Sequence, residues 1–212
     1  MSEEKKTDNF LMKCWLETIQ TIVGPNGLKS ILHYAHLEKY IDNFPPDNDL
    51  LEIPAEDARK LFLALYELFG SKGSRSLSLQ AGREFARIGI EGRSGLVKAV
   101  LLAARLAPEE RKMRLVIEKT VETGNKWYTS SESGPLIELK EDDNYFIVYH
   151  KDRFESEGIS SQEPVCGIYT GMFQYLMEWI TRHKHEVKEI ECRAMGHPAD
   201  VFRIEKARTR ES

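Results

Sequence analysis

The order of hydrophobic patterns along the chain limits its fold more than any other feature. Apolar residues recur every three or four positions through the first half, as after Asp8 and after Pro54, and this spacing predicts amphipathic helices. Runs of aromatic and β-branched residues follow at 127–129, 136–139 and 145–149, separated by turn-forming residues, and such runs predict antiparallel strands. Because most helices precede the strands instead of alternating with them, the sequence predicts an α+β fold.

Glycine and proline predict where the elements begin and end. The predicted helices run from Asp8 to Gly24, over 28–36, from Pro54 to Gly70, over 76–88, over 96–106 and from Pro108 to Gly124. Pro164 opens one more amphipathic helix. Residues 187–194 and 201–204 are then expected to close the fold as a β-hairpin around Gly196.

The charge of the chain argues against a nucleic-acid partner. Its formal net charge is -4, and no basic stripe that could neutralise phosphates is visible. Residues 1–8 include acids and no apolar core, so they do not resemble a secretory signal. The longest apolar stretch, 96–107, is too short to span a bilayer and contains Lys98 and Arg105. We therefore expect a cytoplasmic protein, in which three cysteines serve metals or the core more often than disulfides.

Four potential metal ligands stand in the last part of the chain: Cys166, Glu189, Cys192 and Asp200. Cys166 follows Pro164 in the first turn of its predicted helix, where free N–H groups and the helix dipole favour a thiolate. Cys192 and Asp200 should project from one face of the hairpin, whereas Glu189 would join them only through a bulge. Thiolates and carboxylates in one small volume need a cation, and Zn²⁺ held by four protein donors has no open position for chemistry.

Spacing alone leaves a second interpretation open. In that interpretation the two cysteines are small buried hydrophobic residues and the two acids lie on the surface. The chain has no C-x-x-C pair that would decide between the two.

The segments 166–171 and 192–204 resemble the signature of the 4-vinyl reductase domain family of bacteriochlorophyll-synthesis-associated and hydrocarbon-binding proteins. The matching positions are Cys166, Glu189, Cys192, Gly196 and Phe202. The resemblance implies zinc at the four ligands. Asp200 stands where the family usually has its last cysteine, which makes the site harder and weaker. His197 is another candidate donor, and Asp200 could instead pair with Arg193 or Arg203.

The resemblance also implies a fold and a pocket. The fold would be helices packed on a twisted antiparallel sheet, as in vesicle-tethering subunits and haem-based nitric-oxide sensors. An N-terminal helical extension would cover 1–49, the 4-vinyl-reductase-like domain 50–206 and a tail 207–212. A hydrophobic pocket would lie between helices and sheet, although periodic aromatic residues are also typical of a core. The aromatic residues expected to line it are Trp127, Tyr145, Phe146, Tyr169 and Phe173.

The function expected from these features is a stand-alone domain that binds a hydrophobic or tetrapyrrole-like small molecule and is braced by structural zinc. The alternatives are an accessory role in vinyl-group reduction of (bacterio)chlorophyll precursors and a non-catalytic tethering subunit. No glycine motif for a nucleotide hydride donor is present, which disfavours catalysis. Phe10, Met12 and Leu16 flank the apolar stripe of the first helix, so we also expect a homodimer.

Overall fold

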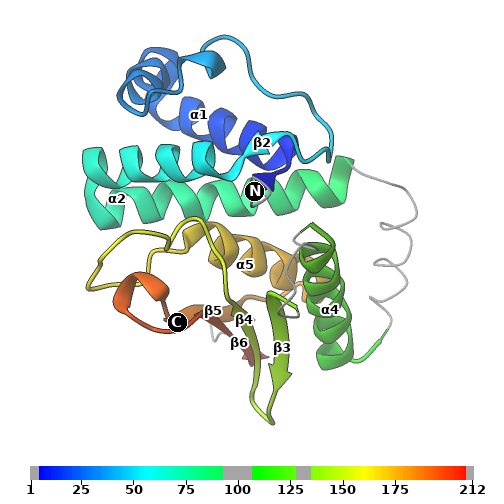
Figure 1. The fold of residues 1–212 in the computed structure, drawn as a ribbon. Helices are drawn as coiled ribbons and strands as arrows, with labels where there is room; N and C mark the ends of the chain where they lie inside the picture. Colours follow the sequence, from blue (N-terminus) through cyan, green and yellow to red (C-terminus); the bar gives the residue numbers. More distant parts are fainter. Residues whose placement is uncertain (1–4, 93–106, 128–134, 209–212) are drawn as a thin grey trace.

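The computed structural model describes residues 5–92, 107–127 and 135–208 (Figure 1). Its elements are β1 (Lys6–Thr7), α1 (Asn9–Tyr34), the 3-10 helix η1 (Glu38–Tyr40), β2 (Ile53–Pro54), α2 (Ala55–Gly92), α4 (Glu109–Trp127), β3 (Ile137–Glu141), β4 (Tyr145–His150), α5 (Gly167–Thr181), β5 (His185–Glu191), the 3-10 helix η2 (Arg193–Met195) and β6 (Asp200–Arg208). The predicted α+β class is confirmed. Among the described helices, none is both long and apolar enough to cross a membrane.

Strands β3 to β6 form one antiparallel sheet in the order β3-β4-β6-β5. Alternate residues of β4, namely Phe146, Val148 and His150, are fully buried, and the residues between them are part-exposed. A strand alternates in this way when one face of its sheet is covered, because successive side chains point to opposite faces. The covered face packs against α4 and α5.

The helices are stacked in layers over this sheet. In Figure 1, α1, α2, α5 and the sheet follow one another, and α4 lies beside α5. A Cβ added at Gly171 would lie 2.1 Å from the carbonyl oxygen of Leu79, and one at Gly82 would lie 2.0 Å from that of Ile168. Only a hydrogen atom fits at such distances, so these glycines let α2 and α5 approach closely. The start of α5 is thereby held against α2.

Gly24 and Gly70 each separate two helical segments within α1 and α2. Gly24 has φ 77° and ψ 166°, and Gly70 has φ 68° and ψ 178°, a region that favours glycine. The predicted breaks at these glycines are therefore present, but each second helical segment begins directly after its glycine, earlier than the predicted starts at residues 28 and 76. Pro25 continues α1 directly, because its fixed φ and missing N–H suit the first turn of a new helical segment.

Two other predicted elements have different outcomes. The helix predicted over 96–106 lies outside the described residues, as do positions 128 and 129. Trp127 is the last residue of α4, so a strand at that position is wrong. The helix continues through Gly124 because this residue packs closely against β3, where an added Cβ would lie 2.5 Å from the side chain of Ile137.

The amino-terminal helix belongs to the same hydrophobic core as the rest of the chain. The exposed fractions of Phe10, Met12 and Leu16 are 2%, 1% and 0% within a single chain. The sequence argument for a homodimer is therefore wrong, because the side chains expected to need a partner are already buried. As predicted, Asp8 caps α1, accepting a hydrogen bond of 2.8 Å from the backbone N–H of Leu11.

Candidate metal centre and ligand cavity

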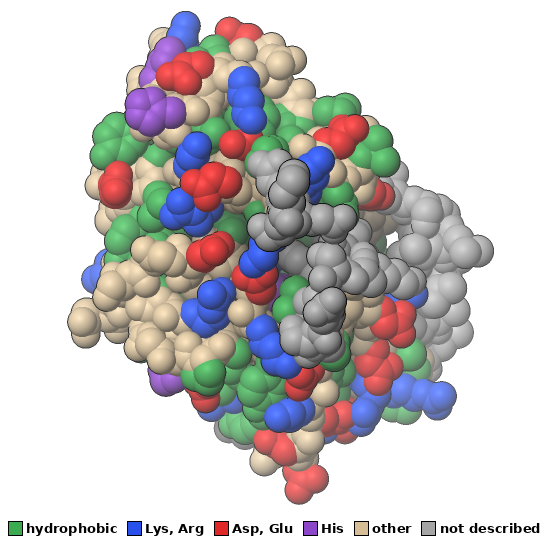
Figure 2. All heavy atoms as spheres, in the orientation of Figure 1, with side chains coloured by type: hydrophobic (Ala, Val, Ile, Leu, Met, Phe, Trp, Pro, Cys, Tyr) green, Lys and Arg blue, Asp and Glu red, His purple; other side chains and the backbone are tan. Residues whose placement is uncertain are grey.

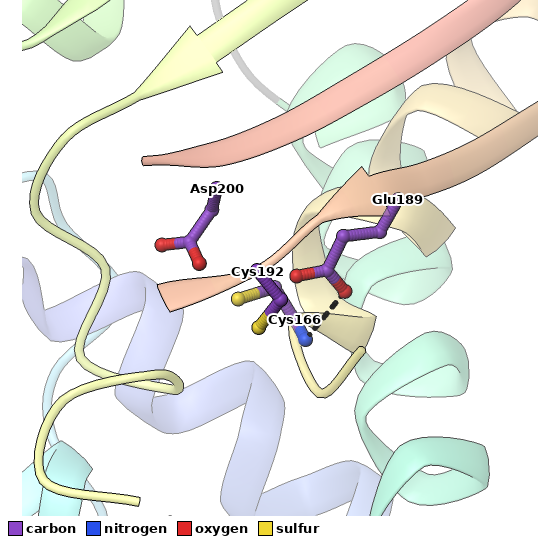
Figure 3. Close-up of side chains that lie close together, drawn as sticks. All are labelled: Cys166, Glu189, Cys192 and Asp200. Carbon is purple, nitrogen blue, oxygen red and sulfur yellow. Dashed lines mark hydrogen bonds between the residues drawn. The ribbon is translucent and has the colours of Figure 1, made fainter. Parts of the chain in front are cut away.

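Four side chains from the carboxyl-terminal part meet in one buried cluster (Figure 3). Cys166 immediately precedes α5, Glu189 lies on β5, Cys192 follows β5 and Asp200 begins β6. One ligand atom from each residue lies within 4.8 Å of those of the other three, and all four residues are buried. The predicted ligand set is therefore brought together in space, and we call it the thiol–carboxylate cluster.

An irregularity in β5 allows Glu189 to reach this cluster. Glu189 pairs with Phe202 and Glu191 pairs with Val201, so two steps along β5 match one step along β6. The extra residue, Ile190, points outward and is 40% exposed. Because of this bulge, Glu189 and Cys192 point to the same side although they are three positions apart.

The hairpin register differs in detail from the sequence expectation. The strand predicted over 187–194 ends at Glu191, and Ala194 lies in η2, which forms the turn between β5 and β6. His197 is 41% exposed at its side chain, and its Nδ1 lies 4.0 Å from Glu191, outside the cluster. The tight 3-10 turn ends at Gly196, whose φ of 91° favours glycine.

The carboxylate of Asp200 is oriented by uncharged hydrogen-bond donors, which do not neutralise its negative charge. The backbone N–H of Arg193 donates to its Oδ1 at 2.8 Å, and the hydroxyl of Ser156 donates to its Oδ2 at 2.7 Å. The expected alternative, a pair with the guanidinium of Arg203, is not formed, because that group lies 3.6 Å from Glu186. The carboxylate is oriented by neutral donors and keeps capacity to accept a cation.

Glu189 supplies a further sign that the cluster suits a cation. Its Oε2 accepts a hydrogen bond of 2.9 Å from the backbone N–H of Cys166 and lies 3.7 Å from Nη1 of Arg75. Its Oε1 is buried and has no hydrogen-bond partner among the described residues. A buried carboxylate oxygen without a partner is costly, and a metal ion at the centre of the cluster would satisfy it.

The pKa values of the cluster residues are shifted because several acidic groups lie close together in a buried site. Burial, and next the charge on Cys192, raise the pKa of Glu189 to about 9. Burial also raises the pKa of the Cys166 thiol well above its usual range, whereas a hydrogen bond with Cys166 lowers the pKa of Cys192 to about 7. The sequence-based expectation of a thiolate at Cys166 is therefore wrong for the metal-free protein, because burial outweighs the helix dipole. A cation would take the place of the protons held there.

An apolar cavity of about 350 Å³ lies beside the cluster, between α1, α2, α4 and α5. Its walls include Phe10, Phe85, Ile90, Ile168, Met172 and Leu176. Ile168 lies only two positions after Cys166, so the cavity and the thiol–carboxylate cluster share the first turn of α5. This size falls in the range of roughly 300–1,000 Å³ that is common for small-molecule sites.

The five aromatic residues expected in a pocket are placed differently. Tyr169 lines the cavity, while Phe146 and Phe173 are fully buried in the core and outside its lining. The Tyr145 ring lies 4.7 Å from the guanidinium carbon of Arg203 on the part-exposed side of β4. The side chain of Trp127 lies outside the described part of the structure.

Several cavity residues were not predicted from the sequence. Phe10 and Phe85 come from helices that are far from the 4-vinyl-reductase-like signature, and their helical spacing is that of ordinary core residues. Arg153 lies in a charged loop segment, Lys151-Asp152-Arg153, which reads as solvent-exposed. No local signal distinguishes it from its neighbours.

The comparison with protein families finds a match in the carboxyl-terminal part of the chain. The 4-vinyl reductase domain family matches residues 146–206, a span that contains the whole thiol–carboxylate cluster. Residues 146–206 are similar to the 4-vinyl reductase domain. No curated protein sequence shows significant similarity to it.

The matched residues and the helices before them share the fold of solved H-NOX proteins. An Fe(II) unliganded H-NOX protein from K. algicida superposes with a TM-score of 0.65 and 14% identity, covering 97% of this chain and 99% of that one. A structure from work on heme distortion in the H-NOX family gives 0.61 and 14%, over 97% and 98%. An oxygen-binding H-NOX domain related to soluble guanylate cyclases gives 0.53 and 13%, over 94% and 95%. The architecture predicted from the resemblance is thus confirmed.

Proposed function

We propose that this protein binds a hydrophobic small molecule in the cavity between α1, α2, α4 and α5. The observation that carries the proposal is the cavity itself, which is apolar and about 350 Å³ in volume. A purely tethering subunit would be expected to have a solid interior instead. Solved H-NOX proteins of the same fold include one studied for its heme and one that binds oxygen, which supports the same assignment.

We further propose that the thiol–carboxylate cluster binds Zn²⁺ as a structural ion. Two sulfur and two carboxylate donors match the ligands that zinc accepts, and the partnerless Oε1 of Glu189 is consistent with a cation between them. The ion would neutralise the cluster and connect the start of α5 to the β5–β6 hairpin. With four protein donors it would leave no position for a reacting substrate.

A haem or another tetrapyrrole is a less suitable ligand for this cavity. The described lining contains no histidine or cysteine, two common haem ligands, and of the other usual haem ligands it offers only Met172 and Tyr169. Its volume is also near the lower limit of small-molecule sites. We therefore favour an organic ligand smaller than a tetrapyrrole.

Native mass spectrometry of the protein as purified tests both parts of the proposal. The wild type should carry a zinc-sized mass increment, which Cys192→Ala should lose. Cys14→Ala is the matched control, because Cys14 is equally buried but lies on α1, outside the cluster. An organic adduct would identify the ligand. A bare polypeptide mass after incubation with zinc would contradict the metal site.

A further inference from the structure

Arg153 brings a positive charge to the wall of a mostly apolar cavity. It follows β4, lines the cavity and is only 3% exposed. Its guanidinium carbon lies 4.4 Å from the ring centre of Tyr169 and 5.1 Å from that of Phe154. Placing a guanidinium in an apolar wall is costly, so its presence there calls for an explanation.

Neighbouring groups hold this guanidinium in a fixed position. Nη2 of Arg153 donates to Oε2 of Glu155, and both side chains are buried. Oε1 of Glu155 accepts a hydrogen bond of 3.0 Å from the backbone N–H of Ile168 in the first turn of α5. The acid is thus anchored to the helix that forms a cavity wall. A guanidinium fixed by an ion pair and two rings is pre-organised to receive an additional acceptor.

The charges around the cavity favour a ligand that accepts hydrogen bonds. Besides Arg153, the charged lining residues are Lys119 and Asp49. Lys119 and Asp49 are both exposed, and Nζ of Lys119 lies 3.0 Å from Glu122. Arg and Lys side chains only donate hydrogen bonds, so a polar group beside Arg153 has to be an acceptor.

Neither the net charge nor the face in view in Figure 2 offers a general attraction for anions. The formal net charge is -4, and Figure 2 shows Lys and Arg interspersed with Asp and Glu on the face in view. Selection of an acidic ligand would therefore have to arise inside the cavity, at Arg153.

We propose that the cavity ligand is a small carboxylic acid with an apolar body, whose carboxylate binds Arg153. This inference rests on the proposed function and names the ligand class for the same cavity. A planar guanidinium matches a carboxylate in shape and hydrogen-bond geometry. The apolar body would lie against Ile168, Met172 and Leu176 on α5. At roughly 30 Å³ per non-hydrogen atom, the volume corresponds to about a dozen such atoms.

Decanoate and 1-decanol form a matched pair of probes, because they share one chain and differ in the head group. Their affinities for the full chain would be measured by titration calorimetry at neutral pH. A charge-assisted hydrogen bond contributes about 1.5–3 kcal/mol, so decanoate should bind the wild type at least about tenfold more tightly. Arg153→Met should remove the preference, and Arg153→Lys should restore part of it.

Two further variants test whether a loss of binding in Arg153→Met comes from misfolding and not from the missing guanidinium. Arg153→Met combined with Glu155→Gln removes both members of the buried ion pair, so neither charge is left unpaired, and it should bind both probes equally. Arg87→Met is the matched control, because Arg87 is also paired with carboxylates but is exposed on α2, outside the cavity. It should keep the preference for decanoate.

The outcomes separate this inference from the proposed function. Equal affinities in the wild type, or an unchanged preference for decanoate in the double variant, would overturn the inference and leave a hydrophobic-ligand site intact. Failure of both probes to bind the wild type would count against the proposed function as well.

Discussion

The carboxylate of Glu189 accepts a hydrogen bond of 2.9 Å from the backbone N–H of Cys166, although the whole of α5 separates the two residues in sequence. This contact joins the β5–β6 hairpin to the start of the helix that carries Ile168 and Tyr169 into the cavity. The thiol–carboxylate cluster and the cavity are therefore two parts of one structural unit. A substitution in the cluster should therefore change the stability of that unit, even though none of the four cluster residues lines the cavity.

Metal-free protein should lose stability as the pH rises. The pKa of Glu189 is about 9 in the folded chain and has an ordinary value of 4.5, so the folded state binds more protons between these limits. The free energy of unfolding should therefore fall from about pH 4.5 to about pH 9. Glu189→Gln should remove this contribution, because an amide does not ionise. Urea unfolding in the presence of a chelator, at several pH values, measures the difference; parallel profiles for both proteins would contradict it.

Zinc binding should show the opposite dependence on pH. The metal requires deprotonated ligands, and the raised pKa values of Glu189 and Cys166 mean that protons must leave when it binds. The apparent affinity should therefore increase from about pH 6 to about pH 8, with protons released on binding. Competition with a chromophoric chelator measures the affinity, and an affinity independent of pH would show that these groups are not ligands.

Ser156→Ala should weaken zinc binding without unfolding the protein. The hydroxyl donates to Oδ2 of Asp200 at 2.7 Å and orients that carboxylate. Losing such a supporting contact typically costs about 10–100-fold in metal affinity, while the loss of stability should be only about 1 kcal/mol. Ser30→Ala is the control, since the Ser30 hydroxyl donates to the backbone carbonyl of Asn26 on the exposed side of α1, away from the cluster. Equal zinc affinities for the two variants would exclude Asp200 as a ligand oriented by Ser156.

Local patterns in the sequence predicted much of the fold and of the cluster. Asp8 and Gly196 were identified because capping and left-handed turns depend on one or two residues. Glu189 was predicted to need a bulge, and the bulge at Ile190 is present. Local rules succeeded where the deciding interactions lie within a few residues.

Long-range packing accounts for what the sequence did not reveal. From its local sequence Phe10 is expected to be exposed, but the packing of α2 beside α1 buries it. Arg153 is likewise expected on the surface, but α5 covers it. In each case the side chain is buried by a helix that is distant in sequence, and the periodicity of the residues around it cannot indicate that helix.

Gly171→Ala should destabilise the protein strongly and weaken zinc binding with it. The added Cβ would lie 2.1 Å from the carbonyl oxygen of Leu79, so α5 would have to move away from α2. Overpacking of this kind costs about 1–3 kcal/mol or more. Since Cys166 immediately precedes α5, the same shift would displace one ligand of the thiol–carboxylate cluster. Gly89→Ala is the matched control on α2, because its nearest neighbour would be Phe10 at 3.9 Å and alanine favours the helix. Thermal unfolding with and without zinc should separate the two variants, and similar midpoints would show that the close approach of α2 and α5 does not position the cluster.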